Sequence, residues 1–109
     1  MRLKLDKRTG PLYWRTYEKQ FTENTFMPEE RFKENIDWVA KEFVPYGYEM
    51  VCTDGWIEDS FCINENGYLT RHHDSWKHDW KYWADYLNER GMALGVYYNP
   101  TWISPAAVK

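Results

Sequence analysis

The sequence predicts an α/β fold in which three strands alternate with two helices. Two segments carry apolar residues at helical spacing, and three short segments rich in β-branched and aromatic residues alternate with them. The resulting strand–helix–strand–helix–strand order makes two βαβ crossovers, which are right-handed and leave the strands parallel. A chain of 109 residues has the length of one small domain.

The first strand is expected over residues 12–17. Gly10-Pro11 gives a turn signal directly before this segment, and the segment itself is aromatic and β-branched. Residues 19–27 are polar and show no regular apolar spacing, so we expect them to form a loop that leaves the strand.

The first long helix is expected to follow this loop. Pro28 suits the first helical position, and Glu29 and Glu30 fall in the first turn, where the helix dipole favours acidic residues. Pro45 and Gly47 end the helix before the second strand. The apolar stripe has spacings of four, three and four residues: Phe32, Ile36, Val39 and Phe43.

The second strand organises the chain, because it leads directly into an acid and an indole. The apolar run 50–52 predicts a strand that is buried on both faces, as in a parallel sheet. Asp54 emerges at its carboxyl end, where ligands collect in parallel α/β folds, and Gly55 and Trp56 follow. The alternative is a solvated turn in which Asp54 caps the backbone and Trp56 covers the core.

A long connection over residues 57–74 separates the second strand from the second helix. Within it, residues 64–67 form a turn signal that could close a small hairpin between residues 61–63 and 68–70. A connection longer than the usual βα loop is often functional.

The second helix is expected to begin near Trp76, with Asp74 or Ser75 as its cap, and to stop at Gly91. The third strand then covers residues 92–98. The helix has an apolar side whose residues have packing spacing: Trp76, Trp80, Trp83, Ala84 and Leu87.

Polar and aromatic side chains follow three strands and are expected at the same carboxyl edge of the sheet. Tyr17 follows the first strand, Asp54 the second, and Tyr97 lies near the end of the third with small neighbours on its own face. A carboxylate beside flat aromatic rings suits a ligand that is both polar and rich in C–H groups, and a sugar fits this description. No pair of residues forms a recognisable nucleophile and base.

The composition of the chain restricts the classes of partner that we expect it to bind. The formal charge of −3 is too small to indicate a polyanionic partner, and no basic run suggests nucleic-acid binding. No segment has the roughly 18 apolar residues that span a bilayer, and residues 1–8 lack a signal-peptide apolar run. We therefore expect neither nucleic acid nor membrane as a partner, and no cofactor. The protein is cytoplasmic, or exported if its true start is missing.

Two groups of residues could act as metal ligands, but their spacing in the sequence matches no common motif. Cys52 and Cys62 match no metal or redox motif, although a disulfide between them remains open if the protein is exported. Four residues in and after the long connection could suggest a metal site, but their spacing matches no common motif, which favours a solvated loop without metal: His72, His73, Asp74 and His78.

The ordered motifs of the chain resemble the opening of the α-galactosidase family, glycoside hydrolase family 27 in clan D. The likeness runs from about Gly10 to Pro100. The motifs that carry it are Trp14-x-x-Tyr17-Glu18, Tyr46-Gly47-Tyr48-Glu49, Thr53-Asp54-Gly55-Trp56, Asn66-Gly67-Tyr68-Leu69, Trp83-Ala84-Asp85-Tyr86-Leu87 and Gly91-Met92-Ala93-Leu94-Gly95-Val96-Tyr97.

This resemblance implies a sugar pocket at the carboxyl ends of the strands of a (β/α)8 TIM barrel. Asp54 would bond sugar hydroxyls distant from the anomeric carbon, while Tyr17, Trp56 and Tyr97 would line the pocket. Thr53 stands where many members have a second acid, and Tyr17 stands where many have a Trp. These departures leave the sugar open, since related members act on other α-linked sugars, including isomaltose-type units.

The length of the chain restricts what the resemblance implies. A barrel needs about 250 residues, so residues 1–109 would form its amino-terminal portion, with three strands and two helices, as a truncated reading frame would give. In this retaining α-glycosidase family the nucleophile and the acid/base follow the fourth and sixth strands, so both are expected beyond Lys109, and this portion alone would be inactive. Two alternatives are a carbohydrate-binding module and a small flavodoxin-like module.

Overall fold

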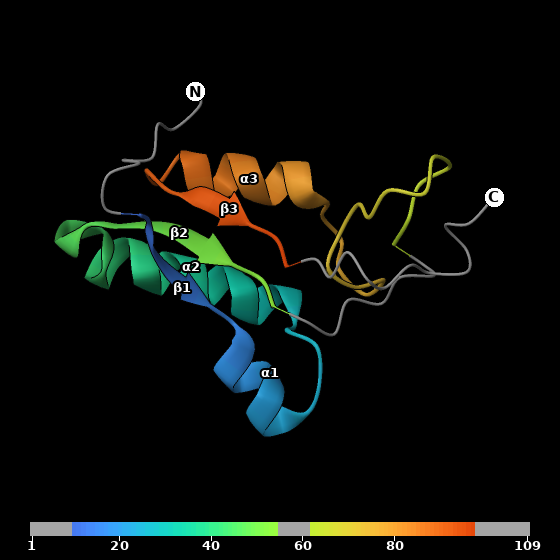
Figure 1. The fold of residues 1–109 in the computed structure, drawn as a ribbon, viewed down its shortest axis with the longest axis horizontal. Helices are drawn as coiled ribbons and strands as arrows, with labels where there is room; N and C mark the ends of the chain where they lie inside the picture. Colours follow the sequence, from blue (N-terminus) through green and yellow to red (C-terminus); the bar gives the residue numbers. More distant parts are fainter. Residues whose placement is uncertain (1–9, 55–61, 98–109) are drawn as a thin grey trace.

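The computed structural model of the chain describes residues 10–54 and 62–97. Three strands form a parallel sheet in the order β1-β2-β3, shown in Figure 1. The predicted α/β class and the parallel strand order are therefore confirmed. The strands are shorter than expected: β1 Leu12–Arg15, β2 Tyr48–Cys52 and β3 Ala93–Gly95.

Two helices cover the sheet. Helix α2, Glu29–Glu42, packs against β2, and helix α3, Trp80–Asn88, packs against β3. The ring of Phe32 lies 5.2 Å from the ring of Trp76 and 5.3 Å from that of Trp83. The predicted stripe of α2 is thus confirmed for Phe32, Ile36 and Val39, and the predicted packing role for Trp76 and Trp83. The buried core consists of Met27, Phe32, Ile36, Val39, Val51, Trp76, Trp83, Leu87 and Met92.

The ends of α2 follow local sequence signals. Pro28 is the extended residue before the helix, one position earlier than predicted. A short 3₁₀ helix η1, Val44–Tyr46, follows α2, and Gly47 ends it with φ of +94°. A residue with a side chain would be strained in that conformation. Gly47 therefore fixes the turn that leads into β2.

The prediction of a loop over residues 19–27 was wrong for its first part, because helix α1, Tyr17–Glu23, follows β1 directly. This helix has no apolar stripe to reveal it. Its buried residue is polar: Gln20 is 0% exposed, and its amide nitrogen donates to the carbonyl oxygen of Asp54 over 3.2 Å. A tertiary hydrogen bond to the end of β2 thus holds a helix that its own sequence pattern does not predict.

The two faces of the sheet differ. Val51 faces the helices and is fully buried, whereas Met50 and Cys52 on the other face are only half-buried. On that second face Tyr13 is 49% exposed and the Arg15 side chain is 53% exposed. The expectation of burial on both faces was therefore wrong for the described residues. We call the second face the open face.

The connection between β2 and α3 contains the predicted turn. Asn64 accepts a hydrogen bond from the backbone nitrogen of Gly67 over 3.0 Å, and Ile63 pairs antiparallel with Leu69. In Figure 1, residues 62–79 lie beyond the ends toward which β2 and β3 point. The predicted partner residue Phe61 lies outside the described residues.

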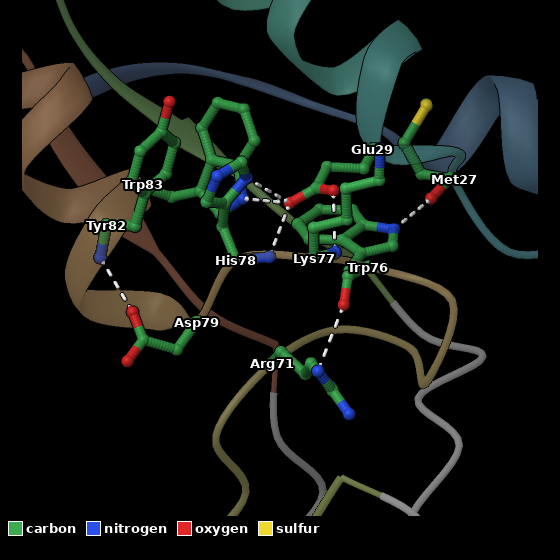
Figure 2. A network of polar contacts seen from close by, with 9 residues as sticks. All are labelled: Met27, Glu29, Arg71, Trp76, Lys77, His78, Asp79, Tyr82 and Trp83. Carbon is green, nitrogen blue, oxygen red and sulfur yellow. Dashed lines mark hydrogen bonds and ion pairs between the residues drawn. The ribbon is translucent and has the colours of Figure 1, made fainter.

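A carboxylate network fixes the last part of this connection against α2 (Figure 2). Glu29 accepts hydrogen bonds from the backbone nitrogens of Lys77 and His78 over 2.7 and 2.9 Å. It also accepts from the indole nitrogen of Trp83 over 3.2 Å and lies 3.0 Å from Nδ1 of His78. Glu29 therefore joins the first turn of α2 to the start of α3.

Helix α3 begins at Trp80, four residues later than predicted. Its cap is Asp79, whose side chain accepts from the backbone nitrogen of Tyr82 over 2.9 Å, rather than Asp74 or Ser75. Trp76 precedes the helix, and its indole nitrogen donates to the carbonyl oxygen of Met27 over 2.8 Å. Several side chains can act as caps here, and Asp79 directly follows the two residues whose backbone nitrogens bind Glu29.

The expected solvated loop around the histidines was wrong for His72, which is 0% exposed. Its Nε2 accepts a hydrogen bond from the backbone nitrogen of Met27 over 3.3 Å, and its ring lies 4.9 Å from that of Trp76. Burial lowers the pKa of His72 to about 4, with a further contribution from nearby His73. The neutral imidazole is therefore part of the core.

We predict that Phe32→Ala lowers the free energy of unfolding by about 3–5 kcal/mol, because it leaves a cavity between two buried indoles. Urea denaturation measures the change. Tyr46→Ala is the matched control, since Tyr46 is 79% exposed, and it is expected to change stability by less than about 0.5 kcal/mol. Equal effects of the two substitutions would contradict the described core.

We predict that His72 makes the fold sensitive to acid. Its pKa is about 4 when folded and near 6.5 when unfolded, so the unfolded state binds more protons as pH falls between these values. Its contribution is fully present above pH 6.5 and decreases by about 3 kcal/mol toward pH 4. Urea denaturation from pH 7 to 4 should show a shallower decline for His72→Gln. Parallel curves would contradict the prediction.

Candidate functional site

The parallel register places the predicted strand-end residues at one level. Arg15 lies opposite Cys52 in the sheet, and Cys52 lies opposite Gly95. Three of the predicted site residues lie two positions after these aligned residues in the sequence: Tyr17, Asp54 and Tyr97. The structure therefore brings their backbones to the same carboxyl edge of the sheet.

Hydrogen bonds continue across this edge after the strands end. The backbone nitrogen of Thr53 donates to the carbonyl oxygen of Gly95 over 2.9 Å, and that of Tyr97 donates to Oγ1 of Thr53 over 3.4 Å. Thr53 is 2% exposed. Thr53 thus joins the end of β2 to the residues after β3.

The backbone of Asp54 is held from the other side by α1 and the residue before it. Its nitrogen donates to Oγ1 of Thr16 over 3.1 Å, and its carbonyl oxygen accepts from the Gln20 amide. Thr16 and Gln20 also hydrogen-bond to each other through their side chains, and both are buried. Three polar contacts therefore fix the backbone that presents the Asp54 carboxylate.

The Asp54 side chain has a cationic neighbour. Nη1 of Arg15 lies 3.6 Å from Oδ2 of Asp54, and the Asp54 side chain is 12% exposed. The same guanidinium carbon lies 5.1 Å from the centre of the Tyr17 ring, which stacks on Phe21 at 5.6 Å. The edge thus combines an ion pair with exposed aromatic surface, since Phe21 is 64% exposed.

Cys52 lies beneath this edge on the open face. Burial, followed by the nearby Asp54 charge, raises the pKa of its thiol to about 11, while Arg15 opposes the rise. Cys52 and Cys62 are not joined to each other, so the disulfide left open by the sequence is not formed in the structure. A Cβ atom added at Gly95 would lie 2.3 Å from Sγ of Cys52. Gly95 therefore allows β3 to approach the thiol.

The structure places some of the predicted site residues as expected and others differently. Thr53, Asp54 and Tyr97 lie at the strand ends as expected, whereas Tyr17 is the first residue of α1 rather than the end of a strand. Trp56 lies outside the described residues. Sequence analysis missed Arg15, Thr16 and Gln20, and strand alternation offered a signal only for Arg15, two residues before Tyr17.

The histidine cluster is dispersed into separate contacts. His72 is in the core, His73 stacks on Phe26 with ring centres 3.6 Å apart, and His78 contacts Glu29. Among the described residues, no three His, Cys, Asp or Glu side chains are grouped so that they could hold a metal ion. The helices described for this chain also include none that is long and apolar enough to cross a bilayer.

Comparison with known proteins shows that the chain is similar to one segment of a much longer enzyme. It is 54% identical over 100 residues to an isomalto-dextranase from Arthrobacter globiformis, covering 92% of this chain and 16% of that protein. The solved structure of the Arthrobacter globiformis T6 isomalto-dextranase complexed with panose matches it with a TM-score of 0.84, again over 92% of this chain, and 17% of that one. No family model matches the chain.

These findings correct the α-galactosidase assignment. The similar protein is an isomalto-dextranase and not an α-galactosidase, so the predicted membership of the α-galactosidase family is contradicted. The coarser prediction is supported, because the chain matches a segment of a glycoside hydrolase.

We predict that Thr16→Val lowers the free energy of unfolding by about 1–3 kcal/mol, because the buried backbone nitrogen of Asp54 loses its acceptor. Valine has nearly the shape of threonine, so the change isolates the hydroxyl. Thr22→Val is the matched control on the exposed side of α1. Urea denaturation of both variants checks the prediction, and equal stability would show that Thr16 does not support this edge.

Proposed function

We propose that this chain is part of a glycoside hydrolase that acts on α-linked glucans, and that its carboxyl edge forms part of the wall of the sugar pocket. The observation that carries this proposal is the 54% identity to isomalto-dextranase over 100 residues. Identity at this level over nearly the whole described fold supports a shared architecture, which the TM-score of 0.84 matches.

Asp54 is the proposed polar anchor of the pocket. A carboxylate is an acceptor-only group that can take hydrogen bonds from two neighbouring sugar hydroxyls, and such charge-assisted bonds are short and strong. Its backbone is held by Thr16 and Gln20, which supports a fixed position for the carboxylate. Preorganisation of this kind lowers the cost of binding.

Four further residues are proposed to line the pocket with Asp54. Tyr17 and Tyr97 are 36% and 41% exposed, so their rings are accessible for contact with the C–H face of a sugar. Thr53 links the two strand ends and supports the position of Tyr97. Trp56 is proposed from its place two residues after Asp54 in the sequence.

We further propose that residues 1–109 are the amino-terminal part of a (β/α)8 barrel domain. Three parallel strands with helices on one face are a repeating piece of that architecture. Retaining hydrolysis needs two carboxylates about 5 Å apart, and Asp54 is proposed to bind the sugar rather than to serve as either of them. The nucleophile and the acid/base are therefore proposed to come from other strands of the longer protein.

The proposed substrate class is a glucan with isomaltose-type linkages. The isomalto-dextranase structure contains panose, which supports a carbohydrate ligand for this fold. Thr53 carries a neutral hydroxyl and differs in charge from the neighbouring Asp54. This difference supports a pocket with one carboxylate at this edge.

We predict that Asp54→Asn in the full-length protein lowers kcat/KM for dextran by at least about 100-fold, because the buried hydrogen bonds to sugar hydroxyls are lost. The substitution keeps the shape of the side chain, so the melting temperature should stay within a few degrees. Release of reducing sugar from dextran measures the rate.

Asp74→Asn is the matched control, since Asp74 lies in the exposed connection. It is expected to leave kcat/KM within a factor of two. Unchanged kinetics of the Asp54 variant would remove Asp54 from the pocket. A wild-type protein that releases no sugar from any α-linked glucan would overturn the proposed activity itself.

A further inference from the structure

The side chain of Arg15 lies between two of the proposed pocket residues. Its Nη1 is 3.6 Å from Oδ2 of Asp54, and its guanidinium carbon is 5.1 Å from the centre of the Tyr17 ring. Arg15 is on β1, whereas Asp54 follows β2. One side chain therefore contacts groups from two neighbouring strand ends.

The register explains why Arg15 reaches this place. It pairs with Cys52 on the open face, and Asp54 lies two residues further along, where strand alternation returns to the same face. Thr16 and Gln20 hold the Asp54 backbone, whereas Arg15 acts on the rotation of the carboxylate. A cation beside Oδ2 limits that rotation.

The geometry leaves Arg15 able to bind a ligand as well. The Nη1–Oδ2 distance of 3.6 Å is longer than that of a direct charge-assisted hydrogen bond, which is about 2.7–2.9 Å. A guanidinium has five N–H donors in a fixed plane, and this side chain is 53% exposed. It can therefore donate to a neutral oxygen beside the carboxylate.

We propose that Arg15 is a positioning and specificity residue of the sugar pocket, which is an inference that rests on the proposed function. It orients the Asp54 carboxylate and supports the Tyr17 ring. Its free N–H groups donate to the oxygen of a sugar hydroxyl adjacent to the one that donates to Asp54. The pair thus recognises two neighbouring hydroxyls of a pyranose, one through a donor and one through an acceptor.

A pocket residue and an ion pair that only stabilises the fold would respond differently to substitution. Exposed ion pairs contribute little to stability, so loss of Arg15 should barely change the melting temperature. Loss of a bond made equally in the ground and transition states raises KM and leaves kcat almost unchanged. Activity and stability therefore respond differently if the proposal is right.

The test uses Arg15→Met and Arg15→Lys in the full-length protein with dextran as substrate. Arg15→Met should lower kcat/KM about 10- to 100-fold, mainly through KM, because a misplaced pocket group weakens binding. Arg15→Lys keeps the charge without the planar donors and should recover only part of the loss. Arg31→Met is the matched control, because Arg31 is similarly exposed, at 57%, and ion-paired with Glu34 at 3.5 Å.

A rescue experiment separates positioning from structural support. In Arg15→Ala, added methylguanidinium at tens of millimolar should restore at least several-fold activity, whereas methylammonium at equal ionic strength should restore much less. Unchanged kinetics in Arg15→Met, or a loss matched by Arg31→Met, would overturn the proposal. If Asp54→Asn abolishes activity while Arg15→Met does not, this inference alone fails; if neither changes activity, the proposed pocket fails.

Discussion

The arrangement of the second half of the chain depends on the hydrogen bonds that the Glu29 carboxylate accepts. It accepts hydrogen bonds from two consecutive backbone nitrogens and from the indole of Trp83 (Figure 2). These bonds fix the point at which α3 starts, and α3 packs on β3. Without them, three donors from the connection and α3 would need other partners, at a cost comparable to several lost hydrogen bonds.

Placement of β3 in turn determines the geometry of the proposed pocket. The parallel ladder sets Gly95 opposite Cys52, and the hydrogen bonds of Thr53 extend that alignment beyond the strands. On the other side, Thr16 and Gln20 hold the same segment from α1. The end of β2 is therefore supported from both neighbours, which suits a site that must hold a carboxylate in one position.

Much of the fold could be predicted because its signals are local and periodic. The stripe of α2 and the apolar run of β2 identify these elements, and the strand–helix order then implies parallel pairing. Helix α1 escaped prediction because its buried residue, Gln20, is polar and is held by a distant backbone carbonyl. The buried His72 was missed for the same reason, since its partner is the backbone of Met27, 45 residues away.

The candidate site was predictable to a similar extent. Parallel topology alone brings Tyr17, Asp54 and Tyr97 to one edge, but it says nothing of the side-chain contact between Arg15 and Asp54. The kind of sugar was the least accessible feature. Motif likeness pointed to α-galactosidases, whereas the matching enzyme is an isomalto-dextranase, and a shared fold does not by itself fix the sugar.

Because side chains alternate along each strand, the two faces of this sheet differ in how freely their residues can be substituted. Side chains toward the helices fill a fixed volume, as Val51 does, whereas Arg15 and Cys52 project from the opposite side of the same strands. An engineering library aimed at ligand preference could therefore vary the open-face positions without changing the packing of the helices on the sheet. Gly95 is the exception, because a methyl group there would meet the Cys52 sulfur, and such a library should leave it as it is.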